Sequence, residues 1–191
     1  HNSRFTPSVD AGVRQQTQVG FLLLEHFSLP AFTQALDTLV TANLIQPGSC
    51  ASSTFSVDGA AVTSDLGIVI CPAAAITAAL QQPLDLLVIC AGLRTPLVAS
   101  VQLTGWLQAL AHKGVALAGL WNGAWFMSQA GLLDGYRCTV HPEHRAAVAE
   151  TAPRSHVSSE SFVVDRDRLS AASPAGAFNM VLEWLGTKRG T

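Results

Sequence analysis

The sequence predicts an α/β domain built as a three-layer α/β/α sandwich around a mostly parallel sheet. Short apolar stretches alternate with amphipathic ones along the chain, a pattern that is typical of parallel strands joined by helices. Two runs, "LDLLVICAG" (84–92) and "VALAGLW" (115–121), are continuously apolar, as strands buried on both faces are. With 191 residues, of which 49% are hydrophobic and 13% charged, the chain is long enough for one domain with a sizeable core.

The first half of the chain is expected to form the strands and helices that lead up to the strand at 84–92. The run "QVGFLLL" (18–24) is apolar enough for a buried strand, and Ser28 and Pro30 are typical of the start of the helix that follows. Short β-type runs flank a polar turn, and an alanine-rich stretch then favours a short helix. The expected elements are strand 18–24, helix 28–43, strands 54–59 and 67–71, helix 72–82 and strand 84–92.

The second half repeats the alternation. An amphipathic stretch that ends at Gly114 precedes the strand 115–121, and a charged turn divides the last β-type segment. The expected elements are helix 96–114, strand 115–121, helix 123–131, strand 136–140, a short helix within 142–153, two strands within 156–173 and helix 175–186. This is the flavodoxin-like arrangement, in which ligands bind beyond the carboxyl ends of the strands.

Composition limits the classes of partner. The net charge of −2 gives no reason to expect nucleic acid or an anionic membrane at this domain. Residues 1–17 are polar, lack the apolar core of a signal peptide, and are expected to be a flexible arm or a cloning remnant. No apolar run reaches the roughly 18 residues of a membrane span, so we expect a cytoplasmic protein with no membrane partner.

The cysteines and histidines do not show metal-ligand spacing. The four cysteines form no C-x-x-C pair, and buried reduced thiols are favoured over disulfides or a metal site; they are Cys50, Cys71, Cys90 and Cys138. His141 and His144 are three residues apart, with no third ligand nearby. We therefore expect neither a metal nor a cofactor.

The stretch "GLWNG" joins a strand to a helix as a sharp elbow. Many hydrolases place a nucleophile at the middle of G-x-[nucleophile]-x-G, exposed at the sheet edge by a strained backbone. Here the glycines are Gly119 and Gly123, and the middle residue is Trp121. The N–H of Asn122 would point into an oxyanion hole, with a second donor from Ala91 or Gly92. The alternative interpretation is an ordinary tight turn.

The elbow and the residues after it resemble a known family. "WNGAWFMSQAGLLDGYRCTVHP" is similar to the nucleophile region of the class I glutamine amidotransferase-like superfamily, in its PfpI-type branch. That region has Cys-x-Gly, a short helix, Ala-Gly-Leu-Leu-Asp-Gly and Thr-Thr-His. The segment "VGFLLLEHFSLPAFTQALDTLVTANLI" resembles more particularly the GlxA-type subgroup of AraC-family transcriptional regulators. The resemblance extends over residues 18–186.

The family's functional positions are only partly retained. Gly123 matches the glycine of Cys-x-Gly, and His141 matches the family histidine, 20 residues after the elbow. Trp121 stands where the nucleophilic cysteine belongs, and Ala31 stands where the acid belongs. Because an indole forms no acyl or thioester intermediate, the resemblance predicts no catalytic residue. Trp121 then either plugs the old active site or forms the wall of a ligand pocket.

The predicted function is a non-catalytic, ligand-sensing and dimerising domain (18–186) of such a regulator. Residues 187–191 would be a linker to a helix-turn-helix domain that is absent from this sequence and would contact DNA. Members of the subgroup respond to arginine, carnitine or betaine-like compounds, which implies an amino or quaternary ammonium effector and a homodimer. The predicted ligand-pocket residues are Glu25, Phe27, Ala91, Gly92, Trp121, Asn122, Gly123 and His141.

Several interpretations stay open. Glu25 is either a solvated loop charge or the counter-charge for a cationic ligand, and His141 is either a pocket donor or a structural histidine. An alternative function is an enzyme of the same superfamily: a hydrolase, a hydratase or a glyoxalase-like protein. A stand-alone structural or chaperone-like dimer is a third.

Overall fold

A seven-stranded sheet forms the centre of the molecule. The computed structural model describes residues 15–189, and its main sheet has the order β10-β11-β7-β6-β1-β2-β5. Every neighbouring pair is parallel except β10 with β11. The strands are β1 (Thr17–Leu23), β2 (Cys50–Ser56), β5 (Ala74–Ala75), β6 (Leu86–Cys90), β7 (Ala116–Leu120), β10 (Phe162–Asp165) and β11 (Arg168–Ala171). The predicted mostly parallel α/β fold is confirmed.

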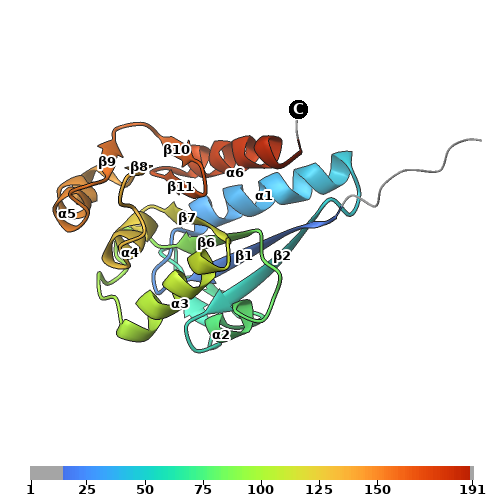
Figure 1. Ribbon diagram of the computed structural model, residues 1–191. Helices are drawn as coiled ribbons and strands as arrows, with labels where there is room; N and C mark the ends of the chain where they lie inside the picture. The colour runs from blue at the N-terminus through green and yellow to red at the C-terminus, as the bar shows by residue number, and fades with distance from the viewer. Residues whose placement is uncertain (1–14, 190–191) are drawn as a thin grey trace, which may run out of the picture.

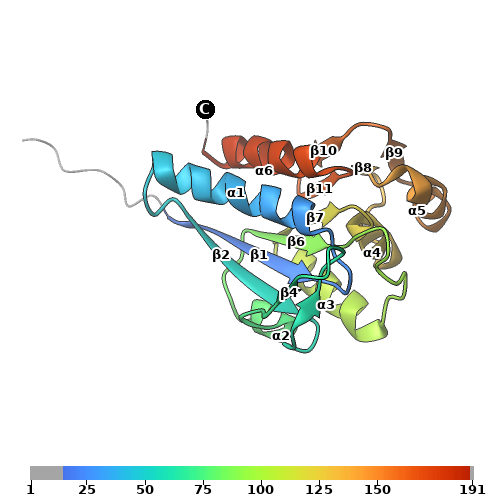
Figure 2. The same cartoon turned by 180° about the vertical axis from the view of Figure 1, so that it is seen from behind.

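Helices cover both faces of this sheet (Figures 1 and 2). On one face, α1 (Leu29–Ile45) and α6 (Pro174–Arg189) lie side by side. On the other face lie α2 (Ile76–Ala79), α3 (Val101–His112) and α4 (Gly123–Gln129), with α5 (Arg145–Thr151) beyond α4. The core is correspondingly divided into two clusters, one on each face.

Strand periodicity explains the two clusters. Successive side chains of a strand point to opposite faces, so Phe21 packs in the cluster beneath α1 and α6, whereas Leu22 packs with α3. Both are fully buried. This is why the central strands are apolar without a break.

Two small sheets flank the main one. The strands β3 (Val62–Thr63) and β4 (Val69–Ile70) pair antiparallel, and β8 (Arg137–Thr139) pairs parallel with β9 (His156–Ser158). A 3₁₀ turn, η1 (Pro142–His144), leads into α5. Both small sheets lie outside the seven-stranded order.

The region between 46 and 83 departs most from the predicted elements. The strand expected at 54–59 is β2, which begins at Cys50, and the one expected at 67–71 shrinks to β4 in a separate hairpin. The predicted helix 72–82 is wrong over its first half, because Ala74 and Ala75 pair as an edge strand with Phe55 and Ser56. Tertiary pairing overrides the helix propensity of alanine there.

Elsewhere the differences lie at boundaries. The helix α3 begins at Val101, not 96, because Ser100 is its N-cap, and 156–173 holds three strands, not two. Ser28 caps α1 as predicted. Residues 1–14 of the predicted arm 1–17 lie outside the described residues, and Thr17 already belongs to β1. The helix α6 continues beyond the predicted end at 186. No helix within 15–189 is long and apolar enough to cross a bilayer.

Candidate functional site

The elbow between β7 and α4 has the strained geometry that its sequence predicts. Trp121 has φ 56°, in the left-handed region that a bulky residue rarely occupies. A Cβ on Gly119 would lie 2.4 Å from the backbone nitrogen of Ala124, and a Cβ on Gly123 would lie 2.5 Å from the carbonyl oxygen of Ile89. Both glycines are therefore required by close backbone approach.

Hydrogen bonds connect the elbow to two other loops at the carboxyl edge of the sheet. The Asn122 side chain donates Nδ2–H to the carbonyl oxygen of Gly92 at 2.8 Å. The N–H of Gly92 is donated to Oγ1 of Thr95, which itself donates to the backbone carbonyl of Glu25, each at 2.8 Å. The loops after β1, β6 and β7 thus form one network. The sequence predicts that these three loops meet, but not that Thr95 joins them.

The Trp121 indole is stacked on the His141 ring. The ring centroids are 4.8 Å apart and the planes differ by 19°. Nδ1 of His141 accepts the N–H of Glu143 at 3.3 Å, which begins η1. His144 packs edge-on against His141, and the pKa of His144 is lowered because burial disfavours the charged imidazole and His141 lies nearby. His141 therefore holds the turn and covers one indole face.

A hollow of about 260 Å³ lies beside Trp121, and its other lining residues are Asp65, Leu93 and Arg94. The Asp65 carboxylate accepts the N–H of Leu29 at 3.0 Å, at the start of α1. Asp65 is also fixed by its own N–H, which is donated to the Phe27 carbonyl at 2.9 Å. The sequence does not point to Asp65 or Arg94, because both are exposed loop residues with no motif around them.

The remaining predicted pocket residues lie elsewhere. Glu25 is exposed and lines a different hollow, together with Val57, Pro96 and Phe126. The side chains of Phe27 and Ala91 are fully buried in the two core clusters. The hollow beside Trp121 therefore has its own carboxylate, that of Asp65, and its own guanidinium, that of Arg94. Glu25 does not line it.

The thiols of this region are not activated. Burial raises the pKa of Cys90, which is fully buried, and raises that of Cys138 to about 11. Ala31, where the resemblance predicts the family acid, is buried in the first turn of α1. Within residues 15–189, no group of three His, Cys, Asp or Glu side chains is arranged to hold a metal ion.

Two buried polar atoms of the elbow lack a hydrogen-bond partner within the described part of the chain. They are Nε1 of Trp121 and Oδ1 of Asn122, a donor and an acceptor on adjacent residues. Buried polar atoms in proteins are nearly always paired. The elbow therefore leaves one buried donor and one buried acceptor unpaired.

This fold and elbow define the class of protein. The model of the DJ-1/PfpI family matches residues 25–187, and the chain belongs to that family. DJ-1beta of Drosophila melanogaster has the same fold, with a TM-score of 0.79 at 17% identity over 93% of this chain and 92% of that one.

Several relatives of higher sequence identity are transcriptional regulators. An AraC family transcriptional regulator from Pseudomonas putida, known from its crystal structure, is 48% identical in sequence to this chain. The two structures match with a TM-score of 0.86 over 91% of this chain and 93% of that chain. The HTH-type transcriptional regulator GbdR of Pseudomonas aeruginosa is 32% identical over 97% of this chain. CdhR of the same species is 31% identical over 89%. The chain spans 50% of the length of both GbdR and CdhR.

Proposed function

We propose that this chain is the non-catalytic effector-sensing and dimerisation domain of an AraC-family transcriptional regulator. The effector is a small compound that carries both a cationic amino or quaternary ammonium group and a carboxylate. The observation that carries the proposal is the hollow beside Trp121, which combines an aromatic face, a carboxylate and a guanidinium. The regulator relatives support the regulatory part.

The absence of covalent chemistry follows from the elbow residue. Trp121 takes the strained position at which the family resemblance expects a cysteine, and an indole has no nucleophilic atom for acyl transfer. Neither Cys90 nor Cys138 replaces it, since burial holds both thiols protonated. The resemblance predicts Ala31 at the position of the family acid. Binding without turnover is therefore the function that this site supports.

The charges of the hollow match a zwitterion. A cation over an indole face is attracted by the ring quadrupole. Since His141 covers one face of Trp121, the ligand cation has to contact the other, beside Asp65. A carboxylate on the same ligand pairs with Arg94.

Isothermal titration calorimetry tests this assignment with glycine betaine, carnitine and arginine as ligands. We expect Trp121→Ala to weaken binding by roughly 2- to 30-fold, since one cation–π contact contributes about 0.5–2 kcal/mol. Asp65→Asn should weaken it by about 2- to 5-fold, because an exposed ion pair contributes up to about 1 kcal/mol. The asparagine Oδ1 can still accept the Leu29 N–H, so the cap of α1 is preserved.

Matched controls separate this hollow from a general charge effect. Glu25→Gln removes one negative charge from the neighbouring hollow and should leave the affinity unchanged. The carbon analogue 3,3-dimethylbutanoate has the shape of glycine betaine without its cation and should bind more weakly. Binding by none of the three ligands, or binding indifferent to both Trp121 and Asp65, would refute the assignment.

Apolar side chains on the β3–β4 hairpin support the dimerisation part of the proposal. Leu66, Ile68 and Val69 are each more than half exposed, at 63%, 53% and 56%. Grouped exposed apolar side chains of this kind mark protein–protein contact surfaces.

A further inference from the structure

An apolar groove runs between α1 and α6 on the face of the molecule away from α3. Its volume is about 310 Å³. Its walls are Thr38, Thr41, Ala42 and Ile45 from α1 and Phe178, Leu182, Leu185 and Gly186 from α6, with Gln46 at one end. At its base, Oγ1 of Thr38 donates to the carbonyl oxygen of Phe178 at 3.3 Å, joining the two helices.

The groove exposes apolar surface that nothing within residues 15–189 covers. Ile45 is 82% exposed and Leu182 is 53% exposed. The wall residues recur at helical spacing on each side, for example Thr38, Ala42 and Ile45 on α1. A groove between two parallel helices with this spacing accepts the apolar face of a third helix.

The length of the curated relatives bears on which helix could occupy the groove. The chain spans half the length of GbdR and CdhR, both of which are HTH-type regulators. The last described residue, Arg189, lies three positions beyond Gly186, which is itself a wall of the groove. Antiparallel helices are commonly joined by loops of about 2–5 residues, so a helix that follows α6 closely can fold back onto the groove.

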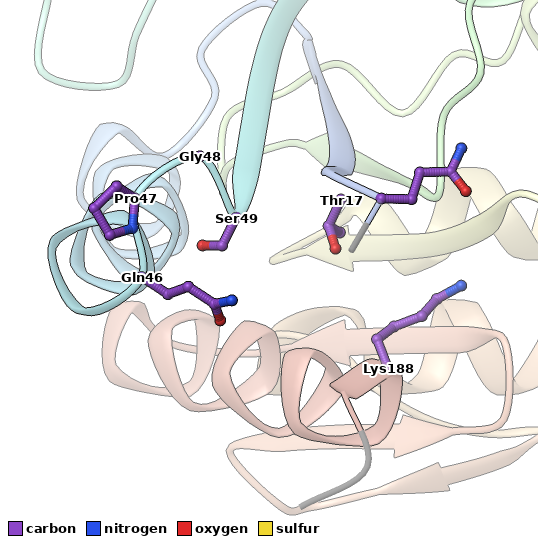
Figure 3. Close-up of a pocket in the computed structure, with 7 residues that line it drawn as sticks. Thr17, Gln46, Pro47, Gly48, Ser49 and Lys188 are labelled. Atoms are coloured by element: carbon purple, nitrogen blue, oxygen red, sulfur yellow. The ribbon is translucent and has the colours of Figure 1, made fainter. Parts of the chain in front are cut away.

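We propose that this α1–α6 groove docks an amphipathic helix of the DNA-binding domain that follows α6 in the full-length protein. A polar hollow of about 300 Å³ adjoins it and shares Gln46. Figure 3 shows Gln46, Ser49 and Thr17 facing Lys188 of α6 across this hollow. An apolar centre beside a polar margin is the usual composition of a domain interface.

The same two helices begin close in sequence to residues that bond the candidate effector site. The first backbone N–H of α1, that of Leu29, is held by Asp65. On the other side, the N–H of Trp121 is donated at 2.9 Å to Ala171, the last residue of β11, and α6 begins three residues later at Pro174. A domain seated in the groove therefore rests on α1, whose first N–H bonds Asp65 of the hollow, and on α6, which begins three residues after the hydrogen-bond partner of Trp121. This link depends on the proposed effector site, whereas the docking depends only on the regulatory part of the proposed function, the DNA-binding domain.

Thiol labelling tests the docking in the absence of effector. In a Cys71→Ser background, which removes the exposed native thiol, Ile45→Cys and Leu182→Cys probe the groove. Leu44→Cys is the matched control, because Leu44 is 79% exposed on the same helix but is not a groove wall. Each is labelled with a maleimide in the 191-residue chain and in the protein expressed from its complete reading frame.

We expect labelling at positions 45 and 182 to be slower by about tenfold or more in the longer protein, the ratio that about 1.4 kcal/mol of docking gives. Position 44 should react at the same rate in both proteins. The slowing at positions 45 and 182 should persist when the longer protein is diluted until it is monomeric. Equal rates at position 45, equal slowing at position 44, or a reading frame that ends at Thr191 would each overturn the proposal. Slowing that disappears on dilution would also overturn it, because a second copy would then be the occupant.

Discussion

Replacing Gly92 with alanine tests how tightly the carboxyl edge of the sheet is built. A Cβ at this position would lie 2.3 Å from the carbonyl oxygen of His26, 3.0 Å from the nitrogen of Ser28 and 3.2 Å from the carbonyl carbon of Phe27. All three contacts are backbone atoms, so no side chain can rotate away. An ordinary van der Waals distance requires the segment 26–28 to move by about 1 Å.

That segment is held from both sides. The N–H of His26 is donated to Thr63 at 2.8 Å, and that of Ser28 is donated to Ala91 at 3.1 Å. Overpacking of this kind costs about 1–3 kcal/mol, and weakening one buried hydrogen bond adds about 1 kcal/mol. We therefore expect Gly92→Ala to lower the free energy of unfolding by about 2–4 kcal/mol. For a domain of this size that corresponds to a loss of roughly 5–15 °C in Tm.

The control makes the same chemical change where space is available. Gly105 lies inside α3 and is exposed, and a Cβ added there would have no neighbouring atom within 4 Å. Gly105→Ala should raise the free energy of unfolding by about 0.5–1 kcal/mol, the usual gain from removing an interior helix glycine. Urea unfolding followed by circular dichroism measures both. A Gly92→Ala protein within about 0.5 kcal/mol of the parent would refute the steric reasoning, since a detectable mutational loss starts near that size.

Two further predictions concern the thiols and the acid side of the stability profile. In the folded protein only Cys71 should react quickly with a thiol reagent, because Cys50, Cys90 and Cys138 are buried. Cys71→Ser should abolish the fast phase of labelling, and a second rapidly reacting thiol would contradict the packing. The pKa of His144 is lowered, chiefly by burial, so the folded state favours the neutral ring. Its contribution to stability should be present above a pH of about 6.5 and lost as the pH falls below that value. Thermal melts across this range should show a shallower acid-side decline for His144→Asn, and an unchanged slope would contradict the prediction.

The sequence by itself determined the architecture and the elbow. Alternating apolar and amphipathic stretches identified the central strands, because burial on both faces leaves no room for polar residues in β6 and β7. Gly119 and Gly123 identified the elbow, because only glycine tolerates backbone atoms at 2.4–2.5 Å from its Cβ position. Both features are local in sequence, so a local pattern records them.

Only the tertiary structure decided which side chains share the hollow. Asp65 and Arg94 come from separate loops and meet beside Trp121, whereas Glu25, which directly follows a strand end, lines another hollow. The short edge strand β5 and the α1–α6 groove likewise depend on segments that are distant in sequence. A local pattern records the period of burial along one segment. The direction of an exposed loop side chain is set instead by the other segments packed against that loop. The sequence of the loop has no periodic pattern that could encode those segments.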